Sequence, residues 1–237
     1  MSFDLSNRPE FARAIKTKLL AHLKEGGLDA TELDLFDWYV KETEALGEQM
    51  LATEQTYIQS QIDSGLEDLN DSGMIPVQYF IRRTRYSHAI YIASLGETYL
   101  KDAIRRLTTL LGDNLPFKLA ELSGKDWLRE RRYLERYGRF VIPDEVWKGF
   151  MGIYKVRNAL AHENGNVDTM YDEDRERLIK QYAGIPGISV GQYELNVEPS
   201  YIAYAIGSLK ALASFLDGEI AQLVDRAIKP QVVSPES

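Results

Sequence analysis

Apolar residues recur every three or four positions along most of the chain, which is the spacing of an amphipathic α-helix. The pattern predicts helices from Pro9 to Glu25, from Thr31 to about Leu69, from Pro76 to Leu111, from Trp127 to Tyr137, from Pro143 to a stop at Asn164-Gly165, from Asp172 to Tyr182 and from Tyr201 to Ala227. Strand-like alternation is confined to Ile188–Val197, around Gly191, and favours a small β-hairpin. The predicted fold class is therefore all-α, an antiparallel helical bundle with at most one hairpin near 188–197.

The longest apolar patterns mark the expected framework of this bundle. The 31–69 segment opens in capping-box style at Thr31 and has few helix breakers, so we expect it to form a spine. Its apolar residues are Leu35, Trp38, Tyr39, Leu46, Met50, Tyr57, Ile58 and Ile62. The closing helix carries its core face on Ile206, Leu209, Leu212, Phe215, Leu216, Ile220 and Leu223. The pattern divides the chain into an N-terminal helix (1–30), the bundle (31–228) and a polar tail (229–237).

Composition narrows the class of protein. The chain has 237 residues and no cysteine, which removes disulfides and thiolate chemistry and is compatible with a reducing cytoplasm, where we expect the protein to reside. No signal-peptide pattern is visible at the N-terminus, and no apolar run is long enough to predict a bilayer span or a membrane partner. The three histidines are widely separated, so neither a metal site nor any cofactor is predicted.

Charge is distributed unevenly along the chain. The net charge is −8, yet residues 76–139 hold 13 basic and 7 acidic residues, whereas 1–75 hold 6 and 15 and 140–237 hold 9 and 14. A basic region on an acidic protein steers a polyanion to one face. We therefore expect RNA contacts from Arg82, Arg83, Arg85, Arg129, Arg131 and Arg132. The alternative for any one of these residues is an ordinary solvated helix face paired with acids.

The candidate chemistry lies at the end of the helix that begins at Pro143. Arg157 falls in the apolar stripe of that helix, between Ile153 and Leu160, where a guanidinium is costly unless an anion meets it. At about 100° per residue, Asn158 and His162 stack one turn apart. Histidine transfers protons near neutral pH, and arginine binds phosphate in a bidentate manner. The alternative is a structural arginine paired with a buried acid, beside a histidine that complements the helix dipole.

A second helix supplies such an acid. Glu97 is flanked at helical spacing by Ile90, Ala93, Leu100 and Ile104, so we expect it to point inward. A buried acid on one helix and a buried arginine on another are natural partners. Glu97 is therefore predicted to hold Arg157.

Arg157-Asn158-x-x-x-His162 resembles the signature of the HEPN superfamily, small helical bundles with an Arg and a His separated by four to six residues and usually a polar residue after the Arg. The segment Leu95–Leu100, with Glu97, resembles the other bundle helix of that family. The resemblance covers roughly Thr31 to Ile228 and is specific at these two helices. Many members are metal-independent endoribonucleases of prokaryotic defence, toxin–antitoxin and RNA-processing systems.

The resemblance implies an activity, partners and roles for residues. RNA would be cut by attack of the ribose 2′-hydroxyl, with His162 as acid or base, Arg157 on the phosphate, and Asn158 and Glu97 as orienting groups. It also implies a homodimer and an antitoxin or defence-system partner. Asn164 stands where members paired with a nucleotidyltransferase antitoxin commonly have Tyr, which argues against that subfamily. The alternative function is a non-catalytic HEPN-like module that binds nucleic acid or protein.

Overall fold

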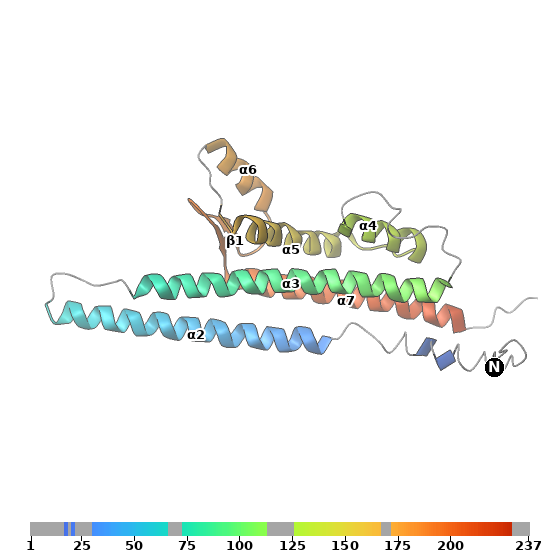
Figure 1. Ribbon diagram of the computed structural model, residues 1–237, viewed down its shortest axis with the longest axis horizontal. Coiled ribbons are helices and arrows are strands. Elements are labelled where there is room, and N and C mark those ends of the chain that lie inside the picture. The colour runs from blue at the N-terminus through green and yellow to red at the C-terminus, as the bar shows by residue number, and fades with distance from the viewer. Residues whose placement is uncertain are drawn as a thin grey trace, which may run out of the picture. The chain divides into compact units, whose positions relative to one another are not determined.

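The computed structural model describes residues 17–18, 20–21, 30–65, 73–112, 126–166 and 172–228. In these residues the helices are α2 (Ala30–Asp63), α3 (Met74–Leu111), α4 (Asp126–Tyr133), the π-helical turn η4 (Leu134–Gly138), α5 (Asp144–Glu163), α6 (Asp172–Tyr182) and α7 (Pro199–Ile228). The strands are β1 (Ile188–Val190) and β2 (Leu195–Val197). The protein is all-α with one small hairpin, as predicted (Figure 1).

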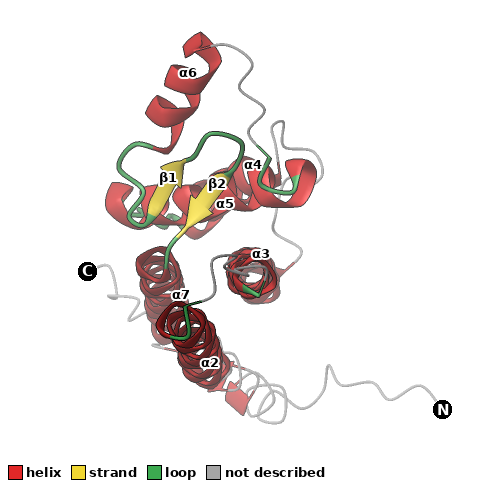
Figure 2. Ribbon diagram, turned by 90° about the vertical axis from the view of Figure 1, so that its left-hand side faces the viewer, coloured by secondary structure: helices red, strands yellow, loops and turns green. Residues whose placement is uncertain are grey.

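The hairpin is antiparallel, and its register pairs Ile188 with Val197 and Val190 with Leu195. On its other side the second strand approaches the end of α5, through an isolated bridge between Asn166 and Glu194. Figure 2 shows the two strands beside α5. The hairpin therefore lies next to the candidate chemistry.

Some predicted segments fall outside the described residues. The predicted helix from Pro9 to Glu25 is described only at residues 17, 18, 20 and 21, which are helical, and Leu20 is buried. The tail from Lys229 and the Asn70-Asp71-Ser72 turn also lie outside them. The 31–69 helix ends earlier than predicted, at Asp63, because Gly65 adopts a left-handed φ of 74° that stops the helix.

The chain forms two compact units. Unit 2 comprises 31–96 and 144–210, and unit 1 comprises 1–30, 97–143 and 211–237, so α3 and α7 each contribute residues to both. This division groups the residues differently from the predicted domain limits at 30 and 228, and those limits stay a prediction.

In unit 2, the α3 segment lies between α2 on one side and α5 on the other (Figure 1). Gly96 allows this close packing, because a Cβ there would come 2.6 Å from the Phe150 ring of α5. Lys210 of α7 donates to Asp34 of α2 at 2.7 Å, and Tyr91 of α3 donates to Glu32 of α2 at 2.9 Å. Contacts therefore join segments of α2, α3, α5 and α7 within unit 2.

In unit 1, Arg106 is only 4 % exposed and donates to Asp217 of α7 at 2.6 Å. This arginine therefore belongs to the interior of unit 1. The predicted helix over Trp127–Tyr137 is α-helical to Tyr133 and then widens into the π turn, which Arg139 ends with a φ of 57°.

The residues that α2 buries are not the ones that dominate its apolar pattern. Leu33, Phe36 and Val40 are buried. The large apolar residues Leu35, Trp38, Tyr39, Leu46, Tyr57 and Ile62 are exposed. The helix has two apolar stripes, and in the described residues only the one that faces α3 is covered.

His88, three residues after Arg85 on α3, is buried in unit 2. It is 3 % exposed, and its ring meets the rings of Phe36 and Tyr39 edge-on, each at 5.5 Å between centroids. Its Nε2 lies 3.5 Å from the Thr43 hydroxyl, and no described group bonds its Nδ1. Burial lowers the pKa of His88; Glu44 opposes this effect and Arg85 adds to it.

We expect acidification to destabilise the protein through His88. Since the folded-state pKa lies below the ordinary value of about 6.5, the unfolded chain binds more protons between those two values. Stability is therefore fully present above about pH 6.5 and falls as the pH drops towards the folded-state pKa, by up to about 1.4 kcal/mol per pH unit. Thermal melts across this range should show a shallower pH dependence for His88→Gln. His162→Ala removes an exposed histidine and serves as the control for the loss of an imidazole.

Candidate active site at the end of helix α5

Helix α5 forms because its sequence suits a helix at both ends and supplies one apolar face that can be buried. Asp144 and Glu145 lie in the first turn, where negative charge complements the helix dipole. Its buried stripe consists of Trp147, Phe150, Ile153, Val156 and Leu160. The helix ends as predicted, at Asn164 and Gly165, whose φ values are 56° and 72°. Asparagine and glycine are the residues that adopt this left-handed conformation most readily.

Close contact with α7 fixes the position of α5. A Cβ at Gly149 would come 2.8 Å from the Ser208 hydroxyl, so the two helices approach closely at this point. On the α3 side, the fully buried Phe150 lies against Gly96, where a Cβ would come 2.6 Å from its ring. These contacts fix the first half of α5, and the helix continues without a break to Glu163.

Arg157 is half-buried near this end. Its Nη1 donates to Oδ1 of Asn158 at 3.0 Å, and its guanidinium carbon lies 5.9 Å from the centre of the Tyr154 ring. Its Nε is buried and has no hydrogen-bond partner among the described residues. Within unit 2, no described carboxylate pairs with it. A guanidinium carries five N–H donors, and the described hydrogen bond to Asn158 uses one of them, so terminal N–H groups remain for an anion.

His162 and Asn158 are both exposed on the same helix. Because α5 is a regular α-helix through Glu163, the two residues stack one turn apart as predicted. No hydrogen bond holds the His162 ring among the described residues. An exposed imidazole without a structural partner is free to exchange protons with a substrate.

Glu97 lies in unit 1, whereas Arg157 lies in unit 2. The Glu97 side chain is 28 % exposed, and its carboxylate is 4.0 Å from Lys101 one turn along α3. The predicted contact between Glu97 and Arg157 would join the two units and stays a prediction.

The turn that follows His162 is held by the α3 segment and the hairpin. Tyr86 lies directly against Gly165, since a Cβ at that glycine would come 2.6 Å from the tyrosine ring. The Tyr86 hydroxyl donates to the Leu195 carbonyl at 2.6 Å, and the Leu195 N–H donates to the Gly165 carbonyl at 2.8 Å. Burial raises the pKa of Tyr86, which keeps its hydroxyl protonated as the donor. Tyr86, Gly165 and Leu195 thus form a closed set of contacts, which we call the turn lock.

Arg83 is the one predicted RNA-binding arginine that the structure places against the motif end. It donates from Nη1 to the Asn164 side chain, two residues after His162. Its guanidinium also lies over the rings of Tyr79 and Tyr86, at 4.9 and 5.7 Å from their centres. An arginine at this place sets a positive charge beside the candidate site.

Arg82 and Arg85 are engaged by acids within unit 2. Arg82 pairs with Glu194 of the hairpin. Arg85 binds Glu44 of α2 in bidentate fashion, through Nε at 2.9 Å and Nη2 at 2.7 Å, and also lies 3.5 Å from the Val197 carbonyl. Both pairs hold helices and hairpin together. RNA contact by Arg82 and Arg85 stays a prediction, and RNA would have to compete with these acids for the two guanidinium groups.

The remaining predicted RNA contacts lie on α4, in unit 1. Arg131 pairs with Glu135 at 2.6 Å, Arg129 is half-buried, and Arg132 is exposed. Arg132 is therefore the member of this set most open to solvent. These arginines and the α5 end belong to different units, so the predicted continuous RNA path stays a prediction.

Sequence reasoning did not single out three residues that shape this site: Glu44, Tyr86 and Glu194. Glu44 could have been found by the reasoning that singled out Arg157, because it falls four residues after Val40 and three before Gly47, both of them buried. Tyr86 and Glu194 gave no local signal. Their roles depend on contacts between segments more than a hundred residues apart.

In the part of the chain that the structure describes, no three His, Asp or Glu side chains gather as a metal ion would require. None of the helices in those ranges is long and apolar enough to cross a bilayer. Comparison of the chain with family models, with curated proteins and with solved structures gave no match.

Proposed function

We propose that the protein is a metal-independent endoribonuclease that acts in a prokaryotic antiviral defence or toxin–antitoxin system. The observation that carries the proposal is Arg157: a half-buried guanidinium with an unbonded Nε, on the same helix end as the exposed His162. An arginine whose donors are left open binds phosphate well, and an exposed imidazole is suited to proton transfer. The resemblance to the HEPN superfamily supports the same assignment and supplies the biological setting.

The proposed reaction is an internal transfer at phosphorus. The ribose 2′-oxygen attacks the adjacent phosphate, the bond from phosphorus to the 5′-oxygen breaks, and a 2′,3′-cyclic phosphate results. His162, or its copy in a second subunit, takes the 2′-hydroxyl proton or gives a proton to the leaving 5′-oxygen. Arg157 binds the phosphate oxygens as negative charge develops on them. Asn158 holds the guanidinium through its Oδ1, and its amide nitrogen is available to a phosphate oxygen.

The decisive experiment is incubation of the full chain with total RNA in the presence of EDTA, beside the His162→Ala variant. We expect wild type to produce 2′,3′-cyclic phosphate ends and the variant to produce none. DNA lacks the 2′-hydroxyl, so it should remain intact. Cleavage that requires a divalent metal, or that proceeds equally well on DNA, contradicts the proposal.

The proposed enzyme is a homodimer, in which two His162 residues share the roles of base and acid across a twofold axis. The resemblance to the HEPN superfamily is what supports this assembly. Light scattering should give twice the chain mass at micromolar concentration. A strict monomer under those conditions contradicts this assembly.

A second function is favoured by a different observation. Two of the three arginines predicted to contact RNA in unit 2, Arg82 and Arg85, are held by Glu194 and Glu44. That arrangement suits a non-catalytic module that binds nucleic acid or protein, with an architectural basic helix. If His162→Ala leaves both thermal stability and every effect on RNA or host growth unchanged, this second function is the correct one.

A further inference from the structure

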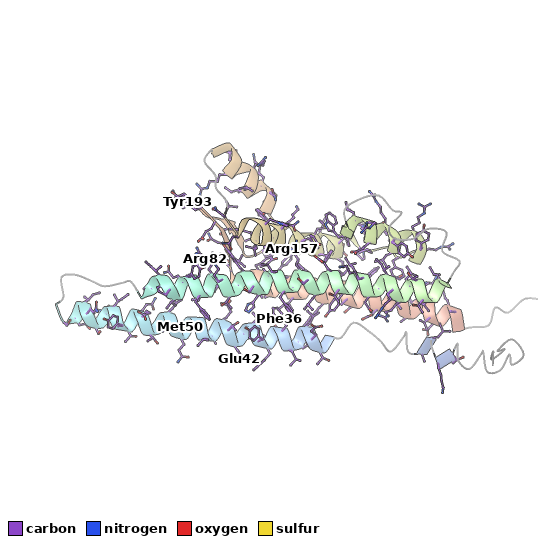
Figure 3. All side chains as sticks on the ribbon, viewed as in Figure 1. Phe36, Glu42, Met50, Arg82, Arg157 and Tyr193 are labelled. Carbon is purple, nitrogen blue, oxygen red and sulfur yellow. The ribbon has the colours of Figure 1, made fainter. Side chains whose placement is uncertain are left out.

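A cleft of about 480 Å³ opens in unit 2 between α2, the first part of α3 and the hairpin. Its walls come from α2, α3 and the segment 194–198, and they carry the charged residues Glu44, Glu48, Arg82, Arg85, Glu194 and Glu198. This volume lies in the range of cavities that hold a small ligand or one or two side chains. Figure 3 marks Arg82, which lines this cleft on α3.

The charges in this cleft do not balance. Four glutamates and two arginines line it, so its net charge is −2. Arg85 neutralises Glu44, and Arg82 neutralises Glu194. Glu48 has no cationic partner among the described residues, and the Glu198 carboxylate accepts only the Ser200 hydroxyl there, at 3.2 Å. Two carboxylates, one from α2 and one from the end of the hairpin, therefore remain open to a cation.

Apolar side chains also line the cleft, beside the polar Gln78 and Asn196, and two of the large ones are exposed. Ile75 is 69 % exposed and Tyr79 is 51 % exposed, although both line the cleft. Leu51, Ile81 and Val197 supply further apolar surface inside it. Apolar surface left exposed beside polar groups is characteristic of a surface that a partner covers.

We propose that this cleft binds a lysine or arginine side chain from an apolar, basic segment of a partner protein. The aliphatic stem packs against Leu51, Ile75 and Tyr79, and the cationic head reaches Glu48 and Glu198. Charge complementarity excludes RNA as the occupant, since a phosphate would meet two unpaired carboxylates. A simple polyamine would leave the exposed Ile75 and Tyr79 uncovered, whereas the apolar neighbours of a basic residue in a protein segment cover them.

This inference stands apart from the proposed nuclease activity, because the cleft contains neither Arg157 nor His162. It is compatible with either candidate function. It also gives a role to Glu48, one of the acidic residues of the N-terminal third of the chain.

Binding can be measured with a short blocked peptide of alternating leucine and lysine, titrated into the full-length protein by calorimetry. We expect the Glu48→Gln, Glu198→Gln double variant to bind the peptide at least about tenfold more weakly than wild type, because two charge-assisted contacts are lost. Both residues are exposed, so these isosteric changes should leave the melting temperature unchanged. Tyr79→Ala should also weaken binding, by removing apolar wall.

Any cationic peptide is attracted to a protein of net charge −8, so the control must remove equal charge elsewhere. Glu42→Gln and Glu54→Gln together provide this control, since both residues are on α2 and neither lines the cleft; Figure 3 marks Glu42. The control should bind the peptide as wild type does. Equal weakening in both double variants, equal binding of a leucine–glutamate peptide, or spermidine that binds as tightly as the peptide would each overturn the proposal.

Discussion

Replacing Arg157 by alanine is expected to lower the rate of RNA cleavage about 10²–10³-fold, because one positioned donor to a developing phosphate charge contributes about that much. The free energy of unfolding should stay within about 1 kcal/mol of wild type, since the guanidinium has no described carboxylate partner within unit 2. Single-turnover cleavage and urea unfolding measure the two quantities separately.

Two further variants sharpen this experiment. Lys155→Ala removes an exposed positive charge from the same helix, and it should change the cleavage rate by less than about twofold. Arg157→Lys keeps the charge but loses the planar fork, so its rate should fall between those of wild type and Arg157→Ala. A loss of about 3–5 kcal/mol in stability for Arg157→Ala would instead indicate a buried pair with an acid such as Glu97. Wild-type cleavage by that variant would exclude Arg157 from the chemistry.

The Gly165→Ala substitution is expected to destabilise the protein by about 2–6 kcal/mol. A side chain at a φ of 72° is strained by about 1–3 kcal/mol, and the new Cβ would come 2.6 Å from the Tyr86 ring. The ring cannot move aside without losing the hydrogen bond from its hydroxyl to Leu195, so overpacking adds about 1–3 kcal/mol.

Gly207→Ala is the matched control for that substitution. Gly207 lies in α7 with an ordinary helical backbone, and a Cβ added there would meet no atom within 4 Å. Alanine there should stabilise the protein by about 0.5–1 kcal/mol. Urea unfolding of both variants gives the comparison directly. A Gly165→Ala protein as stable as wild type would show that the turn lock is not a constraint on the fold.

The helices and the hairpin were predictable because each depends on local patterns. Asn164 and Gly165 indicated the end of α5, and Ile188–Val197 indicated the strands. The face that α2 buries was not predictable in this way. Leu35 and Trp38 look as apolar as Leu33 and Phe36, and only the position of α3 decides between the two stripes.

The candidate site was likewise predictable only where it depends on local patterns. Arg157 and His162 could be singled out because they break or end a local pattern, and the structure keeps both on one helix end. The partners of the basic helix could not be deduced. Glu44 and Glu194 neutralise Arg85 and Arg82 across sequence separations of 41 and 112 residues, and no local pattern encodes such contacts. Burial of His88 has the same origin, since Phe36 and Tyr39 of a different helix cover it.

The turn lock has a consequence for the newly synthesised chain. Tyr86 bonds to Leu195, which lies 109 residues later, so the end of α5 leaves the ribosome before the strand that fixes it. Contacts of such separation form late in folding, because the intervening chain must first be ordered. The contacts that hold the turn after His162 therefore form only once the chain has been made as far as residue 195. A polypeptide released before residue 195 carries the complete motif and lacks the element that positions it.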